Sequence, residues 1–112
     1  MDTSKAPIYE IWGITQVDNL IGGFVETPAK LFEVKGYMDL LSGDEKTTNN
    51  SFMEESTHIL LTDYRSDINS KEHWLVDENN NRFEITLVDD PVNLHKHLEI
   101  YLKFTGNKNV YR

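Results

Sequence analysis

The sequence contains no cysteine, and this absence removes several classes of protein at once. Without thiols the chain cannot form disulfide bonds, bind an iron–sulfur cluster or cysteine-ligated zinc, or use a thiol nucleophile. A chain without cysteine is also compatible with a reducing compartment.

Long hydrophobic runs are missing as well. The longest uncharged apolar run is Leu20–Val25, and two of its residues are glycine. A membrane-spanning helix needs about 20 consecutive apolar residues. Residues Met1–Pro7 have no apolar segment, so we expect neither a signal peptide nor a membrane span.

Basic residues are few. The chain has 11 Lys and Arg against 19 Asp and Glu, which gives a net charge of −8. This balance argues against a protein that holds nucleic acid by its phosphates or docks on an anionic membrane. The length of 112 residues and the 38% hydrophobic content predict one folded domain over residues 1–112, with residues 1–6 and 106–112 expected to be flexible.

Alternation of apolar and polar side chains predicts strands along most of the chain. The clearest cases are residues 82–88, where Phe83, Ile85 and Leu87 share a face, and residues 97–104, where the alternate residues 98, 100, 102 and 104 point inward. A period of two is typical of strands with one solvent-facing side. Further strands are predicted at 8–17, which is apolar enough for burial on both faces, and at 29–41, 56–65 and 73–77.

Turn residues separate these segments. Glycines 22 and 23 lie in the first connection, Asn79–Asn81 separate the fourth and fifth strands, and residues 91–97 have room for one short helical turn. Short strands divided by turns predict an all-β fold, a small antiparallel β-barrel of about six strands with a long loop between the second and third strands.

That long loop is the least regular part of the sequence, and its residues are our candidate functional segment. It carries four acids and one lysine, and it has no large apolar residue until an isolated phenylalanine–methionine pair. Structureless loops of this length in small domains are usually functional or disordered. Its members are Ser42, Gly43, Asp44, Glu45, Lys46, Thr47, Thr48, Asn49, Asn50, Ser51, Phe52, Met53, Glu54 and Glu55.

Metal binding is the first chemistry to weigh. His95 and His97 are two residues apart, so on a strand they share a face, and Asp89 or Asp90 lies near enough in sequence to add a ligand. Two histidines without a third nitrogen or sulfur ligand are weak evidence, and we favour two histidines at the solvent-facing start of a strand. No cofactor is expected.

Enzymatic activity is not predicted. The sequence has no nucleophile elbow, phosphate-binding glycine loop, dinucleotide fingerprint or calcium-binding loop, and its adjacent acids at turns point apart. Trp12 and Trp74 are expected in the core, with an interface as the alternative. Phe52 and Met53 either fold back onto the barrel or contact a partner.

The order of these features resembles the head-closure proteins of long-tailed bacteriophages, also called head-completion or stopper proteins, of the head–tail joining family. The likeness spans Pro7 to Phe104 and rests on an ordered set of segments rather than on one motif. These are Gly22–Phe24, Val34–Asp39, the acidic loop after Ser42-Gly43, Ser56–Ile59, Asn79–Ile85, Val88–Pro91 and His97–Ile100.

The resemblance implies a structural virion protein of the phage neck, assembled in the host cytoplasm. Copies would form a ring, expected to hold twelve, beneath the portal or adaptor protein. The ring would close the DNA-filled head and offer a docking surface to a tail-completion or tail-tube protein. Residues 42–56 would face the channel, and genomic DNA would pass the acidic lumen without sequence-specific binding.

Three alternatives stay open at this point. The chain resembles in composition an acidic DNA mimic that inhibits a DNA-binding enzyme, and a tail-completion or other neck ring protein is also compatible with the strands. A metal-dependent enzyme using His95 and His97 is the third.

Overall fold

The computed structural model describes residues 2–41 and 56–111 and has an all-β architecture. One 3-10 turn, η2, interrupts the strands, and the described residues form no α-helix. No helix in these ranges is long and apolar enough to span a membrane. The elements are β1 (Ile8–Asp18), β2 (Phe24–Leu40), β3 (His58–Asp63), β4 (His73–Val76), β5 (Asn81–Asp89), η2 (Pro91–Asn93) and β6 (His97–Lys108).

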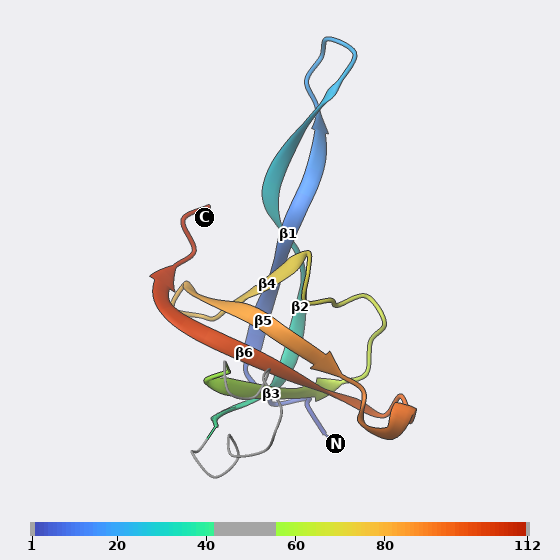
Figure 1. Ribbon diagram of the computed structural model, residues 1–112, viewed down its shortest axis with the longest axis vertical. Helices are drawn as coiled ribbons and strands as arrows, with labels where there is room; N and C mark the ends of the chain where they lie inside the picture. Colours follow the sequence, from blue (N-terminus) through green and yellow to red (C-terminus); the bar gives the residue numbers. More distant parts are fainter. Residues whose placement is uncertain (1, 42–55, 112) are drawn as a thin grey trace.

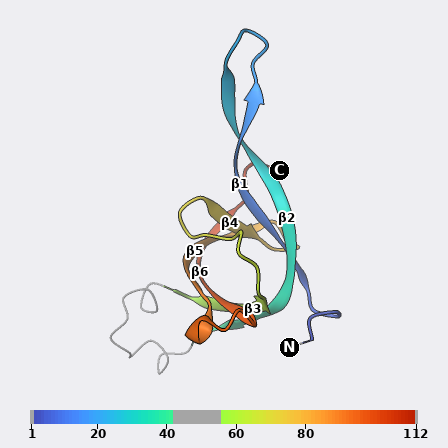
Figure 2. The ribbon, with the colours of Figure 1, turned by 90° about the vertical axis from the view of Figure 1, so that its right-hand side faces the viewer.

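All neighbouring strands are antiparallel, and their pairing closes on itself in the order β1-β2-β3-β6-β5-β4. Figure 2 shows the resulting ring-like sheet from its open side, with β1 and β2 continuing beyond it. Closure leaves the strands of the ring without free edges, which removes a common route to aggregation. The predicted six-stranded antiparallel architecture is confirmed at this level.

The core fills the inside of the ring with side chains from all six strands and from the β3–β4 connection. The alternation in β6 is confirmed for Leu98, Ile100 and Leu102, which are buried, whereas Phe104 lies where the strand leaves the core and packs against Phe83. The buried cluster consists of Ile11, Val34, Leu60, Ile68, Leu75, Phe83, Ile85, Leu98, Ile100 and Leu102.

Bulges in β5 and in β2 alter the expected strand faces. In β5 the register shifts between Ile85 and Leu87, so that Val88, not Leu87, packs against the core, and the predicted inward position of Leu87 is wrong. The extra residue, Thr86, donates a hydrogen bond to the backbone oxygen of Tyr101. A bulge adds one residue to one strand and therefore exchanges the faces of everything after it.

The second bulge lies in β2, where Leu31 is the extra residue, because Ile11 pairs with Phe32 and Trp12 with Lys30. Opposite this bulge three consecutive residues of β1, Ile11 to Gly13, are buried. The expectation that β1 is buried on both faces holds only for this centre. Ile14 and Val17 are exposed because the strand has by then left the ring.

Trp12 and Trp74 are both buried, as the sequence predicted, and form a small second cluster with Val76. Their rings stack with centroids 6.5 Å apart, and the Arg82 guanidinium lies 4.2 Å above the Trp74 ring. The cluster joins β1, β4 and β5 at the place where the ring meets the projecting part of β1.

The two ends of the chain have contacts on the ring. Thr3 and Ala6 are buried, and Thr3 donates a hydrogen bond of 2.5 Å to Asp63. Strand β6 continues to Lys108, and the buried Asn109 exchanges hydrogen bonds with Asn80. The expected flexibility of residues 1–6 and 106–112 stays a prediction.

Candidate functional site

A two-stranded arm projects from the ring (Figures 1 and 2). It is residues 14–29, in which Ile14–Asp18 pair with Phe24–Pro28. Pairing of β1 with β4 ends at Gly13, and pairing of β2 with β3 begins only at Gly36. The two strands of the arm therefore have no other neighbour among the described strands.

The alternation in the sequence predicted the first strand of this arm, within residues 8–17, but not the second. The second strand was predicted to begin near Ala29, whereas β2 begins at Phe24. The signal was present, because Gly22-Gly23 lie between two β-forming stretches and mark a hairpin. Alternation of apolar and polar residues could not show that both strands continue past the core, because a projecting ribbon has no buried face to impose such a pattern.

Apolar side chains cluster at the tip of the arm. Leu20 is 89% exposed, Ile21 87% and Phe24 69%, and Val17 and Val25 beside them are about half exposed. Single exposed apolar residues are ordinary, but a contiguous group marks a surface that binds another molecule. The tip is therefore a candidate interaction surface.

The turn that carries the tip is held in one conformation by side chains. Asn19 Oδ1 accepts hydrogen bonds from the backbone N–H groups of Ile21 and Gly23, each 3.0 Å, and Asp18 Oδ1 accepts one of 2.8 Å from Leu20. Leu20 has a φ of 67°, which is unfavourable for a branched side chain. A turn ordered in advance loses less entropy when its exposed residues bind.

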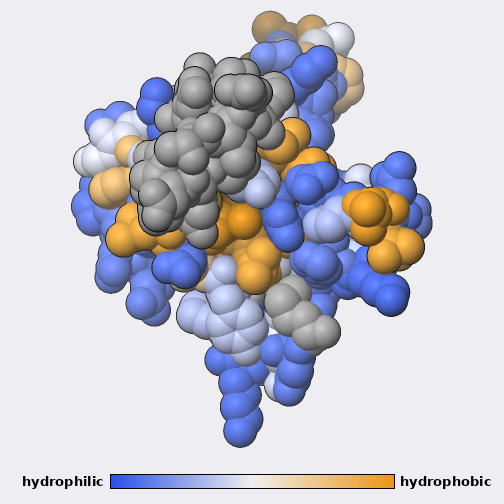
Figure 3. All heavy atoms as spheres, turned by 60° about the horizontal axis from the view of Figure 1, so that its bottom comes forward, coloured by the Kyte–Doolittle hydropathy of each residue, from blue (hydrophilic) through white to orange (hydrophobic). Residues whose placement is uncertain are grey.

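A second apolar projection lies at the other end of the molecule, on the turn between β5 and β6 (Figure 1). Val92 is 83% exposed and Leu94 57%. In Figure 3, viewed from the end opposite the arm, a separate hydrophobic patch lies on the side where Figure 1 places η2, bordered by hydrophilic residues. Val92, Asn93 and His95 have positive φ, so this turn also stores strain.

His95 is part of that turn and not of a strand. Asp90 accepts a hydrogen bond of 3.0 Å from its backbone N–H, and Asp90 Oδ2 lies 2.5 Å from its Nδ1. His97 begins β6, where its Nε2 lies 3.5 Å from Glu99 Oε2. The two histidines therefore do not share a strand face. Within residues 2–41 and 56–111, no group of three or more His, Asp or Glu side chains is placed to hold a metal ion.

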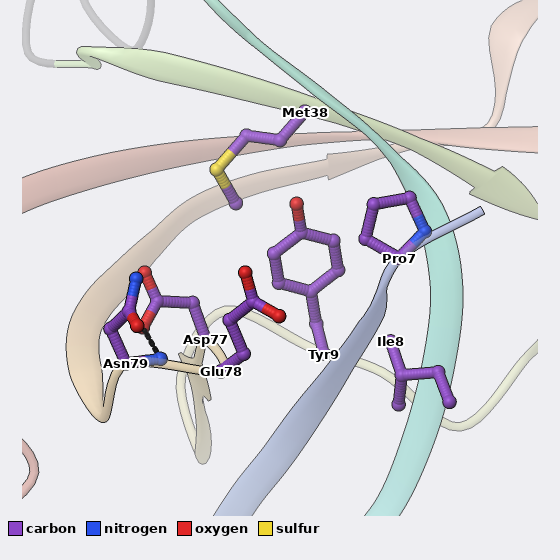
Figure 4. A pocket seen from close by; sticks show the side chains of 7 residues that line it. All are labelled: Pro7, Ile8, Tyr9, Met38, Asp77, Glu78 and Asn79. Carbon is purple, nitrogen blue, oxygen red and sulfur yellow. Dashed lines mark hydrogen bonds between the residues drawn. The ribbon is translucent and has the colours of Figure 1, made fainter.

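A small pocket of about 130 Å³ lies between the start of β1 and the β4–β5 turn (Figure 4). Tyr9 and Met38 form its apolar part, and Glu78 lies beside the Tyr9 ring. Burial raises the pKa of the Tyr9 phenol, and the negative charges of Asp77 and Glu78 raise it further. Asp77 is occupied by the turn, since it accepts hydrogen bonds from the backbone of Asn79 and Asn81.

The candidate channel segment predicted from sequence, residues 42–55, lies outside the described residues. The structure does fix the strands that carry it: Leu40 pairs with His58, and the Leu41 N–H donates a 3.0 Å hydrogen bond to the Thr57 carbonyl. Both ends of the segment thus leave the ring at the same place, and its role stays a prediction.

Comparison with known proteins decides the family. Residues 9–103 match the sequence model of the phage head completion protein family. The chain belongs to the phage head completion protein family. The family is structural and non-enzymatic, so this head completion protein is a component of the virion at the head–tail region and not an enzyme. The predicted family resemblance is confirmed.

Other comparisons add the fold. No curated protein matches this head completion protein. Among solved structures, it is similar to the solution structure of protein SF1141 from Shigella flexneri 2a, with a TM-score of 0.70 and 18% sequence identity. The match covers 91% of this chain and 94% of that one. At this identity the likeness establishes a shared fold alone.

Proposed function

We propose that this head completion protein forms a ring below the portal or adaptor protein, where it closes the DNA-filled head and offers the docking surface for the tail. The observation that carries the proposal is the family match over residues 9–103. The arm and the β5–β6 turn add to it, because they put exposed apolar residues at opposite ends of a molecule 53 Å long and about half as wide. A protein that contacts its own copies and also other virion proteins needs more than one such surface.

The charge of the chain agrees with a position beside moving DNA. A net charge of −8 per copy repels phosphates, so DNA would slide past a ring of copies without being gripped. In this proposal the acidic residues of segment 42–55 face the channel. Deleting residues 44–52 should then impair DNA retention while the circular dichroism of the sheet is unchanged.

The function is tested by supplying the protein to heads that lack it. Phage heads packaged in the absence of this chain should lose their DNA, and purified protein added before disruption should restore nuclease protection and allow tails to join. Heads that keep their DNA without the protein would refute the closing role.

The same experiment distinguishes head closure from tail completion. A tail-completion protein would be found on free tails rather than on tail-less heads. Binding to tails alone, with no effect on heads, would therefore replace head closure by tail completion. Inhibition of a DNA-binding enzyme by a monomer would instead support the DNA-mimic alternative.

A further inference from the structure

The arm carries unbalanced negative charge as well as apolar side chains. Residues 14–29 include Asp18 and Glu26 and no lysine or arginine, and both acids are exposed next to the apolar tip. A surface that receives this tip should be apolar at its centre and basic at its border.

The described chain contains a surface of this kind at the end of β6. A hollow of about 290 Å³ is lined by Arg82, Glu84, Asn107, Lys108 and Val110, and we call it the β6 hollow. Val110 is 77% exposed, and Tyr111 beside it is half exposed. The hollow thus offers apolar side chains together with two basic groups and one acidic group.

The walls of the β6 hollow are held in place. The Arg82 guanidinium lies 4.2 Å from the centre of the Trp74 ring and forms a 2.9 Å ion pair with Glu84. Lys108 Nζ donates a 3.0 Å hydrogen bond to the Asn79 carbonyl. Tyr111 packs against Trp74 too, with 5.9 Å between the centroids of the two rings. Little rearrangement is needed before a partner can enter.

We propose that the arm tip of one copy occupies the β6 hollow of a second copy. The inference rests on the proposed function and deepens it by naming the contact between neighbours in the ring. Leu20, Ile21 and Phe24 would supply the apolar contacts. The two acids of the arm would face Arg82 and Lys108. Together with Glu84 these two basic residues give the hollow a net charge of +1.

The contact has to be made between copies. The arm is a paired ribbon that points away from the ring (Figure 2), so it cannot reach the hollow of its own chain without losing β1–β2 pairs. It also joins two different surfaces, tip and hollow. Such a heterologous contact repeats from copy to copy and closes into a ring when the rotation allows it, as an isologous dimer contact does not.

The absence of cysteine gives a direct test. A protein with Ile21→Cys and Val110→Cys should form disulfide-linked ladders of several copies under mild oxidation, both in concentrated solution and on phage heads. The control pairs Ile21→Cys with Val92→Cys, because Val92 is at least as exposed as Val110 but lies on the β5–β6 turn, at the opposite end of the molecule from the arm. Ladders of equal yield in both proteins, or none in either, would overturn the contact.

Charge reversal tests the same contact without a new bond. Glu26→Lys and Lys108→Glu should each weaken self-association by about tenfold in sedimentation experiments, and the double variant should recover most of the loss. Asp2→Lys makes the same charge change at an exposed acid outside both surfaces and serves as the matched control. Single variants that associate like the parent, or a double variant no better than the singles, would contradict the pairing.

Failure of this inference can be told from failure of the proposed function. Circular dichroism first establishes that every variant keeps its sheet. If the ladders fail while added protein still restores DNA retention in heads, the ring contact is wrong and the closing role stands. If retention does not depend on the protein at all, the proposed function itself fails.

Discussion

Gly36 occupies the closest approach between two strands, and replacing it by alanine is the most direct test of the ring-like sheet. A Cβ at this position would lie 2.4 Å from the Leu61 carbonyl oxygen and 2.9 Å from a methyl group of Leu60. The oxygen belongs to the backbone of β3, which is paired with β2 on one side and β6 on the other. It cannot move without disturbing both ladders.

The magnitude follows from that geometry. Relieving an overlap of this kind costs about 1–3 kcal/mol in a packed interior, and each ladder hydrogen bond lost adds roughly 0.5–1.5 kcal/mol. Reduced freedom of the unfolded chain returns about 0.4–1 kcal/mol. We therefore expect Gly36→Ala to lower the free energy of unfolding by about 2–3 kcal/mol and the melting temperature by roughly 10 °C.

Thermal and urea unfolding, followed by the fluorescence of the two buried tryptophans, measures this loss. Gly23→Ala is the control, since Gly23 has a negative or extended φ and an added Cβ would meet only the Asn19 side chain, at 3.1 Å. We expect it to change the free energy of unfolding by less than about 1 kcal/mol. A Gly36→Ala protein that melts with the parent would refute the close approach of β2 and β3.

Three further predictions concern the core and two titrating groups. Ile100→Asp places an unpaired carboxylate where no solvent reaches and should abolish cooperative folding; a soluble variant with a cooperative melt would mean that the inward face of β6 is wrong. The pKa of Tyr9 is raised in the folded protein, so its contribution to stability is complete below the ordinary tyrosine pKa and is lost as pH rises through the pKa of the folded state. Replacing Glu78 by glutamine removes a nearby negative charge and should lower the Tyr9 pKa in a phenolate absorbance titration. An unchanged titration would contradict the pocket geometry. The hydrogen bond from Arg65 lowers the pKa of Asp67, so its contribution is present above the ordinary aspartate pKa and lost as pH falls through the folded value. Arg65→Gln should raise that pKa in carbon NMR of the carboxyl group, and no change would show that the ion pair is absent in solution.

The strands were predictable wherever one face of a segment packs against the core. In β6 the alternation placed Leu98, Ile100 and Leu102 correctly, because burial on one side leaves its period in the sequence. The same reasoning failed at Leu87, since a one-residue bulge leaves no mark in composition. It found the first strand of the arm but began the second strand at residue 29 instead of Phe24, because residues 24–28 are exposed and have no core to impose alternation.

The functional features, too, were only partly predictable from the sequence. The family resemblance was available from the order of turns and strands, and the match over residues 9–103 confirms it. The apolar run Leu20–Val25 was visible as well, but sequence could not say that it lies at the tip of a projecting ribbon rather than in the core. Conversely, His95 and His97 looked like a pair on one strand, but His95 lies in the turn after η2 and only His97 belongs to β6.

The sequence by itself determined that the chain is acidic, cysteine-free and all-β, and it indicated the family. Composition can be counted directly, and strand periodicity relates residues that are close together in the chain. Tertiary structure decided which apolar residues are buried and which are presented. Residues 8–18 and 24–40 are equally strand-forming along their length, yet only the parts of β1 and β2 within the ring meet the other strands. Large apolar side chains of β1 and β2 are buried only within the ring and are exposed beyond it. The position at which the ring ends is set only by pairing with strands far away in the sequence.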